Sequence, residues 1–395
     1  MMIKGDSMKF RDQKTFNLKE VLLIVLFTVV AVVVSTGLII SKRIKPETEI
    51  VNIKDENIAN FIDAYQTLVN NYYEDIDKKE LMDTVINSMT TYFKDPYTTY
   101  LDKEQTETLV ESLKGEYQGV GVRITAVEEG ILVLEVFEDS PASNAGILIN
   151  DIIVELNGKT VIGRDLVDVT EEITTSEKEV KIKVKREDEL KDFTIKIEKV
   201  NIPSVYSDLI NSKDKKIGYL IITTFASNTY TQFKEKLKYL EKQEIDSLII
   251  DVRGDTGGYL TAVTDILELF LKKGQKIYSV ESKLNTNDFF DETDEHRNYK
   301  VIVLGNETSA SASEILIGAM KDSYKATFVG KTTYGKGKIQ QTSSLEDGGL
   351  LKYTIAKWYV PSGVCIDEVG IKPDYEVTNE DSDLQLLKAV ELLSE

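Results

Sequence analysis

The sequence is poor in cysteine and proline, and its basic residues are outnumbered by its acidic ones. With one cysteine, Cys365, no intramolecular disulfide can form, so the cysteine count leaves the redox compartment open. The 67 Asp and Glu residues outnumber the 48 Lys and Arg residues. This balance argues against nucleic acid as a partner, because phosphate binding needs a basic face. The six prolines leave no long flexible linker.

Histidine is almost absent, which limits the catalytic chemistry. The single histidine, His296, lies in DETDEHRN, an acidic stretch that predicts a solvated loop. A Ser-His-Asp triad is therefore not expected. The carboxylates of the same stretch could bind calcium, but they have no recognisable ligand spacing. We predict no metal site and no other cofactor.

One long apolar run is present, VLLIVLFTVVAVVVSTGLII, at residues 21–40. It carries no charge and is about as long as a membrane-spanning helix requires. A cleaved signal peptide would normally have a shorter apolar region followed by an A-x-A-like site, so we expect an uncleaved transmembrane anchor. Basic residues are more numerous before the run than directly after it, which predicts residues 1–20 as a cytoplasmic tail. The rest of the chain is then expected outside the cytoplasm, at the cell membrane.

Beyond the anchor, the pattern predicts a multidomain α/β protein. Residues 41–54 are polar and indicate a stalk, and residues 55–114 show the spacing of amphipathic helices. Over residues 115–200 the period changes to two, which indicates short strands. Residues 201–380 alternate strands of continuous apolar character with helices, as in a sheet covered on both faces. The spacing of apolar residues in 381–395 predicts a last amphipathic helix. Because amphipathic helices lie near both ends of the chain, we expect that the protein can form a homodimer.

The β-rich segment contains EYQGVGVRI followed by SPASNAGILINDIIVELNGKTV. It resembles the PDZ domains of bacterial proteases. Gly119 and Gly121 would let successive backbone N–H groups converge on a carboxylate while the following strand edge pairs with the peptide that carries it. The resemblance implies that a protein C-terminus binds at Gly119, Val120, Gly121 and Val122.

Lys336 lies in VGKTTYGKGKIQQ, which reproduces most of a phosphate-binding loop. That motif needs a Ser or Thr after the lysine and a helix behind it, but here Gly337 follows and the next residues alternate like a strand. A neutral lysine could instead act as a general base. Lowering its pKa from about 10.4 to near 7 costs roughly 4 to 5 kcal/mol, which burial can impose. Gln340 would lie on the same face of an extended segment and could accept a hydrogen bond from the amine without adding charge.

Two strand-to-helix junctions could supply the remaining groups, because reacting groups gather at the carboxyl ends of strands. In IIDVRGDTGGYL, Gly257 and Gly258 could expose backbone N–H groups to an oxyanion. In VIVLGNETSASASEI, three serines stand near the start of a helix: Ser309, Ser311 and Ser313. A serine in that place can simply cap the helix, so the pattern alone does not decide which of them reacts.

The order DVRGDTGG, TSASASEILIGAMKD, VGKTTYGKGKIQQ, YVPSG and GIKPD, after a PDZ-like domain, resembles the carboxyl-terminal processing or tail-specific proteases. The similarity covers roughly residues 55–380. It implies that Ser311 is the nucleophile, Lys336 its base and Gln340 the residue that orients the lysine. It also implies an oxyanion hole made by the N–H of Ala312 and one N–H from Gly257 or Gly258.

The sequence departs from that family at two places. Asp255 and Thr256 stand where the family often has Asn-Pro, although the glycines that follow are kept. Thr174 and Thr175 follow Ile173 where the family usually has Arg-Gly, which puts any regulatory contact of that arginine in doubt.

We therefore expect a membrane-anchored serine endopeptidase that cleaves proteins near their C-terminal tails, with the PDZ domain holding the substrate's C-terminus. The main alternative is a catalytically silent PDZ scaffold that captures protein C-termini. It is disfavoured because a scaffold has no use for a buried neutral lysine. A crotonase-like acyl-transfer enzyme would leave the PDZ domain unexplained.

Overall fold

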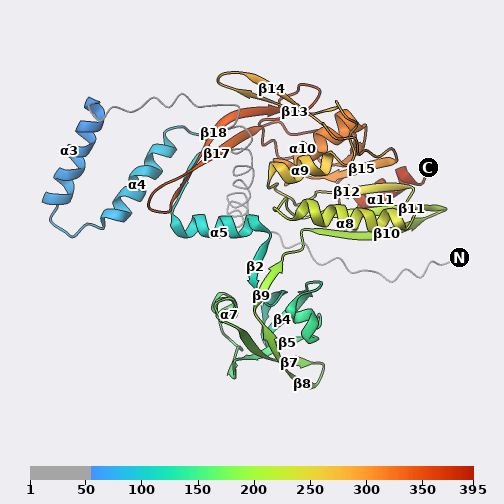
Figure 1. Cartoon of the computed structure of the whole chain (residues 1–395), viewed down its shortest axis with the longest axis horizontal. Helices are drawn as coiled ribbons and strands as arrows, with labels where there is room; N and C mark the ends of the chain where they lie inside the picture. The colour runs from blue at the N-terminus through green and yellow to red at the C-terminus, as the bar shows by residue number, and fades with distance from the viewer. Residues whose placement is uncertain (1–54) are drawn as a thin grey trace.

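The computed structural model describes residues 55–395, drawn in colour in Figure 1. The predicted cytoplasmic tail, membrane anchor and stalk lie outside the described residues. Within residues 55–395, none of the helices is both long enough and apolar enough to cross a membrane.

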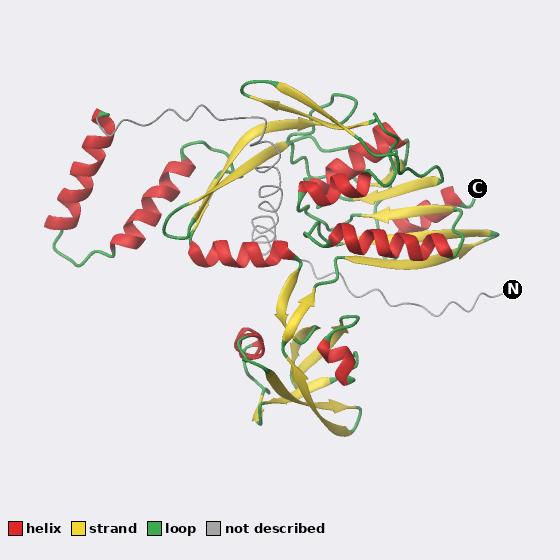
Figure 2. Ribbon diagram, in the orientation of Figure 1, coloured by secondary structure: helices red, strands yellow, loops and turns green. Residues whose placement is uncertain are grey.

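Two helices, α3 (Glu56–Asn71) and α4 (Lys78–Thr91), extend away from the body of the molecule (Figures 1 and 2). Asp55 and Asp77 cap their amino ends by accepting backbone N–H bonds. No residue of α3 is buried, and several large apolar side chains of the two helices are exposed, namely Ile58, Phe61, Ile62, Leu68 and Met89. The described part of the chain therefore leaves the apolar face of α3 uncovered.

The predicted helical region also contains a strand. Helix α5 (Lys103–Lys114) is present, but β1 (Thr99–Leu101) pairs antiparallel with β18 (Leu350–Tyr359). The helical spacing of the surrounding residues could not show this, because the partner strand comes from the other end of the chain. The pairing ties the N-terminal segment to the sheet that carries Gln340.

Residues 122–196 form a separate β-rich domain, which lies below the body of the molecule in Figure 1. Its sheet has the order β3-β4-β5-β7-β8, with β6 paired to β5. Its own core is built from alternate strand residues such as Val133 and Val184. A ribbon of β2 (Glu116–Gly119) and β9 (Glu198–Asn201) joins it to the body. The remaining elements are β3 (Val122–Val127), β4 (Gly130–Val136), α6 (Pro141–Ala145), β5 (Ile152–Leu156), β6 (Lys159–Thr160), α7 (Leu166–Thr174), β7 (Glu179–Arg186) and β8 (Glu189–Lys196).

The α/β core contains a six-stranded sheet in the order β10-β11-β12-β15-β16-β19. Only β10 and β11 are antiparallel to each other, and the other neighbours run parallel. Helices α8, α9 and α10 cover one face, and α11 covers the other. The elements are β10 (Val205–Ser212), β11 (Lys215–Ile222), α8 (Thr229–Lys242), β12 (Ser247–Asp251), α9 (Leu260–Leu267), β15 (Lys300–Gly305), α10 (Ala312–Ala319), the π-turn η1 (Met320–Tyr324), β16 (Thr327–Gly330), β19 (Tyr375–Glu376) and α11 (Leu384–Leu393).

A second sheet lies beside the core in the order β1-β18-β13-β14, with β17 also paired to β18. Its further strands are β13 (Lys276–Ser282), β14 (Thr286–Phe290) and β17 (Lys338–Ser344). The fold is thus a multidomain α/β architecture, as predicted.

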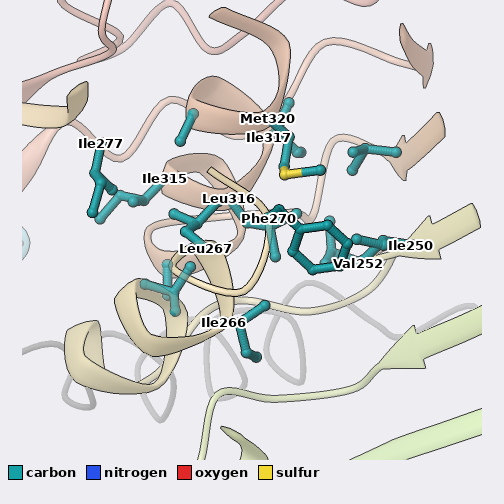
Figure 3. Packing of buried hydrophobic residues seen from close by; sticks show 14 of the residues in the cluster. Ile250, Val252, Ile266, Leu267, Phe270, Ile277, Ile315, Leu316, Ile317 and Met320 are labelled. Atoms are coloured by element: carbon teal, nitrogen blue, oxygen red, sulfur yellow. The ribbon is translucent and has the colours of Figure 1, made fainter. Parts of the chain in front are cut away.

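Dense apolar packing fixes the helix that begins at the serine cluster. Leu316 and Ile317 of α10 are fully buried, and Figure 3 shows them packed among Phe270, Val252 and neighbouring apolar side chains. Because packed interiors leave little free volume, α10 has little freedom to shift. The residues at its amino end are accordingly held in a defined position.

Candidate active site

The backbone of Ser311 distinguishes it from the two other serines. Ser311 precedes α10 with φ of 58° and ψ of −113°, a conformation rarely adopted by a residue with a side chain. Such a conformation costs of order 1 to 3 kcal/mol and is concentrated at functional sites. By contrast, the hydroxyl of Ser309 donates to the carbonyl of Val252 at 2.8 Å, and that of Ser313 donates to the carbonyl of Asp255 at 2.9 Å. Ser309 and Ser313 are therefore engaged in holding loops together.

Lys336 lies in the loop between β16 and β17, and its side chain is 1% exposed. Its ammonium nitrogen is 5.3 Å from the centroid of the Tyr97 ring. Burial lowers the pKa of Lys336 to about 7, against the opposing charges of Glu314 and Asp95. The amine is therefore neutral in a large fraction of molecules near pH 7, as a general base requires.

The glycines on either side of Lys336 are required by close backbone contacts. A Cβ at Gly337 would lie 2.5 Å from the backbone nitrogen of Asp367. Gly335 has φ of 88°, and a Cβ there would lie 2.9 Å from the nitrogen of Gly370. The indole of Trp358 also donates to the carbonyl of Lys336 at 2.8 Å. These contacts press the loop against the following segments and account for the burial of the lysine.

Glu314, which the sequence analysis did not single out, connects the serine to the lysine. It is fully buried in the first turn of α10. Its Oε2 accepts from the backbone N–H of Ser311 at 2.8 Å and of Lys336 at 2.9 Å. Its Oε1 accepts from the hydroxyl of Thr333 at 2.6 Å and the N–H of Gly335 at 2.7 Å. Burial raises the pKa of Glu314, and these four donors oppose that rise.

Gln340 lies on β17 and is also fully buried. A register shift between Ile339 and Gln340 places it opposite Thr354 of β18. Its Nε2 donates to the hydroxyl of Thr354 at 3.4 Å. The predicted Gln340 is thus in the same buried region as Lys336, held by the neighbouring strand.

The loop with the paired glycines lies against the serine. A Cβ at Gly257 would come within 2.9 Å of the Ser311 Cβ and 3.1 Å of the Ala312 nitrogen. The N–H of Gly257 donates to Asp255 Oδ1 at 2.8 Å. Of the two predicted glycine donors, Gly258 is therefore the better candidate for an oxyanion, together with Ala312 at the first position of α10.

The loop of the PDZ domain that is predicted to bind a carboxylate is held by hydrogen bonds to neighbouring residues. Val120 is buried, and its carbonyl accepts from the N–H of Ala142 at 2.8 Å. The N–H of Gly121 donates to the phenol oxygen of Tyr117 at 3.1 Å. Tyr117 lies on the ribbon strand β2, so a side chain from the linker reaches one of the predicted carboxylate-binding N–H groups. Val122 begins β3, the strand edge expected to pair with a peptide.

His296 lies in an exposed loop, where its Nδ1 is 3.4 Å from the carbonyl oxygen of Asp294. This placement matches the solvated loop predicted for DETDEHRN. Within residues 55–395 there is no group of three or more His, Cys, Asp or Glu side chains that could hold a metal ion.

The fold and the site together define a PDZ-containing serine peptidase. Residues 216–377 match peptidase family S41, residues 119–197 match the PDZ domain, and residues 26–105 match the N-terminal domain of the activating protease CtpB.

Two curated relatives place the chain more closely. It is 33% identical over 332 residues to the carboxy-terminal processing protease CtpB of Bacillus subtilis, covering 83% of this chain and 69% of that protein. It is 33% identical over 372 residues to a CtpA-like serine protease of Staphylococcus haemolyticus, covering 93% of this chain and 73% of that protein. The chain belongs to the carboxy-terminal processing proteases of family S41.

Two solved structures share the fold. The photosystem II D1 C-terminal processing protease matches with a TM-score of 0.51 and 24% identity, covering 85% of this chain and 97% of that one. An S41 protease from Bacteroides fragilis matches with a TM-score of 0.52 and 17% identity, covering 82% of this chain and 91% of that one.

Proposed function

We propose that this peptidase uses Ser311 as its nucleophile and Lys336 as its general base. The observation that carries this assignment is the single carboxylate oxygen of Glu314 that accepts from the backbone N–H groups of both residues. This shared acceptor holds the main chains of the strained serine and the buried lysine next to each other. Neither residue needs a histidine or a metal ion for the reaction that follows.

The reaction follows from these positions. The neutral amine of Lys336 takes the proton of the Ser311 hydroxyl as its oxygen attacks the substrate carbonyl. The resulting oxyanion is stabilised by the N–H groups of Ala312 and Gly258. The Lys336 ammonium then gives its proton to the leaving amine, and water hydrolyses the acyl-enzyme by the reverse proton transfers. As Lys336 takes the proton, its ammonium donates a hydrogen bond to Gln340 Oε1, which fixes the direction of the amine.

The substrate is a protein whose C-terminal carboxylate binds the PDZ loop at Gly119, Val120, Gly121 and Val122, with cleavage upstream in the tail. The supporting observation is the ribbon β2–β9, which connects this loop directly to the protease body. Peptide binding at the edge of β3 would add a strand to the PDZ sheet.

The enzyme acts outside the cytoplasm, held at the cell membrane by residues 21–40. The apolar run and the excess of basic residues before it support this location. A homodimer is also proposed, because the apolar side chains of α3 are exposed in the single chain. Nucleic acid is not a proposed partner, given the formal net charge of −19.

The test compares new protein C-termini in cells that carry the parent protein with those in cells that carry Ser311→Ala. Termini that depend on Ser311 support the proposed peptidase. Ser309→Ala and Ser313→Ala serve as matched controls, because their hydroxyls bond to backbone carbonyls. A Ser311→Ala protein that folds and still produces the parent's termini would rule out the assignment. Unchanged termini together with retained binding of C-terminal peptides by the PDZ domain would favour the silent scaffold.

A further inference from the structure

A partly buried chain of hydrogen bonds runs from the N-terminal segment to the buried Gln340. Asp95 follows α4, and its Oδ2 accepts from the hydroxyl of Thr98 at 2.7 Å and from the hydroxyl of Thr354 at 2.5 Å. The hydroxyl of Thr354 in turn accepts from Nε2 of Gln340 at 3.4 Å. The backbone N–H of Thr354 donates to the hydroxyl of Thr98 at 3.2 Å. Two elements far apart in sequence therefore meet beside Gln340.

The direction of each bond in this chain is fixed by the ionised carboxylate at its end. Burial opposes ionisation of Asp95, but the hydrogen bonds from Thr354 and Thr98 outweigh it and hold the pKa of Asp95 below its usual value. An ionised carboxylate only accepts hydrogen bonds, and a threonine hydroxyl has one proton to donate. Thr354 must give that proton to Asp95, so it can only accept from Gln340.

This direction determines how the Gln340 amide is turned. Because Thr354 offers a lone pair, the NH₂ end of the amide faces Thr354 and the carbonyl end faces away. Gln340 Oε1 is buried and has no hydrogen-bond partner among residues 55–395. An unpaired buried acceptor is costly, so its retention suggests a partner that forms during the reaction. The ammonium that Lys336 becomes when it takes the serine proton is such a partner.

We propose that Asp95 is a positioning residue, which acts through Thr354 to keep the carbonyl of Gln340 turned toward the amine of Lys336. This inference rests on the proposed Ser-Lys-Gln mechanism. It makes the segment between α4 and β1 part of the active-site support, although none of its residues is a nucleophile or a base. Attachment of the N-terminal helices is thereby linked to the chemistry.

The negative charge of Asp95 also affects the pKa of Lys336, and the pH dependence of activity reports this effect. The charged and titratable groups around Lys336 come from several elements: Asp95 before β1, Tyr97 in the same segment, Glu314 on α10, Lys338 on β17 and Lys352 on β18. Of these, Glu314 and Asp95 favour the ammonium form of Lys336. Neutralising Asp95 should therefore shift the rise of activity with pH to lower pH, while the loss of amide orientation lowers the plateau.

The experiment measures kcat and KM against pH for cleavage of an unfolded test protein by the purified full chain. Asp95→Asn and Thr354→Val should each lower the plateau kcat about tenfold or more, with KM changed by less than about twofold, because the base is misaligned rather than removed. Only Asp95→Asn should move the rise to lower pH. Thr354→Ser, which keeps the hydroxyl, should restore the parent kcat.

Two further variants separate this role from a structural one. Asp83→Asn is the matched control, because Asp83 accepts from Tyr100 of β1 but does not contact Thr354 or Gln340; it should keep both kcat and the pH profile. Adding Asp95→Asn to Gln340→Ala should lower the plateau by less than about twofold, since both act on one amide. If Gln340→Ala is slow but Asp95→Asn and Thr354→Val keep the parent kcat, Asp95 does not position Gln340. The proposed role of Gln340 in the reaction would still stand. Parent-like activity in Gln340→Ala would instead overturn the role of Gln340 in the proposed function.

Discussion

The backbone amides of Ser311 and Lys336 donate to the same atom, Oε2 of Glu314, at 2.8 and 2.9 Å. Two segments from different parts of the chain, the start of α10 and the loop before β17, are thereby held by one carboxylate. Because these bonds are made to backbone N–H groups, they fix the positions of the main chains and leave both side chains available for chemistry. The carboxylate has four donors in total, and all of them belong to these two segments.

Glu314→Gln should therefore impair the enzyme more than an ordinary surface change would. The amide keeps one acceptor oxygen and replaces the other with an NH₂ group, so two of the four donors face another donor. Each buried donor left unpaired costs about 1 to 3 kcal/mol. We expect a lower free energy of unfolding and a lower kcat, measured by denaturant unfolding and by peptide cleavage. Glu307→Gln is the control, since its carboxylate is largely exposed, and equal behaviour of the two variants would contradict this role.

Lys336 should give activity that rises with pH. Below its pKa, which burial lowers to about 7, the protonated amine cannot accept the serine proton, so activity should increase as the pH passes that value. Lys336→Arg should be as inactive as Lys336→Ala, because arginine cannot be deprotonated in a protein. Rates of cleavage between pH 5 and 9 test both statements. A Lys336→Arg enzyme with substantial activity would exclude the base and favour a cation that only stabilises the oxyanion.

Ionisation of Asp255 should oppose the reaction. Asp255 is fully buried, its Oδ1 accepts from Gly257, and its Oδ2 has no hydrogen-bond partner in the described part of the chain. Burial raises the pKa of Asp255 well above its usual value. As the pH rises through that pKa, a negative charge develops beside the glycine loop and should oppose formation of the oxyanion, so activity should fall. Asp255→Asn is uncharged at every pH and should lack this fall when cleavage rates are measured against pH. A fall that is unchanged in Asp255→Asn would belong to another group.

Lys352 should make stability depend on pH. It is fully buried on β18, and its amine has no hydrogen-bond partner within residues 55–395. Burial, followed by the nearby charge of Lys336, lowers its pKa to about 6. Between that value and the unfolded pKa of about 10.4, the unfolded state binds one more proton, so the free energy of unfolding should rise with pH by roughly 1.4 kcal/mol per unit for this group.

Lys352→Met removes that contribution while keeping most of the side-chain volume. The variant should be more stable than the parent at pH 7, and its stability should rise less steeply toward pH 10. Denaturant unfolding at several pH values provides the measurement. Lys357→Met, an exposed lysine on the same strand, is the control and should keep the parent slope. An identical slope in Lys352→Met and the parent would show that Lys352 does not titrate as proposed.

Sequence reasoning could predict those site residues whose role is marked by their immediate neighbours in the chain. Lys336 stands between glycines, and its local context pointed to it. The small residues before the helix indicated a reactive serine but not which of three, and the resemblance to the processing proteases selected Ser311. Glu314 follows Ser311 at the spacing of a capping box, a signal that by itself indicates only a helix start. Its bonds to Gly335 and Lys336 depend on tertiary packing and have no local signature. Asp95 and β1 were missed for the same reason, since their partners on β18 lie at the other end of the chain.

Tyr117 should control how readily the PDZ domain binds a carboxylate. Its phenol oxygen accepts from the N–H of Gly121, and its ring packs edge-on against Phe137 with centroids 6.5 Å apart. A substrate carboxylate at the same N–H must displace the phenol. Tyr117→Phe keeps the ring and its packing but removes that acceptor, so C-terminal peptides should bind more tightly, by up to about tenfold for one neutral hydrogen bond no longer displaced. Titration of a labelled peptide with a free C-terminus measures the effect, and the same peptide with an amidated C-terminus should bind weakly to both proteins. Weaker binding by Tyr117→Phe would mean that the phenol takes part in holding the peptide, and the loop would then recognise its ligand with the tyrosine in place.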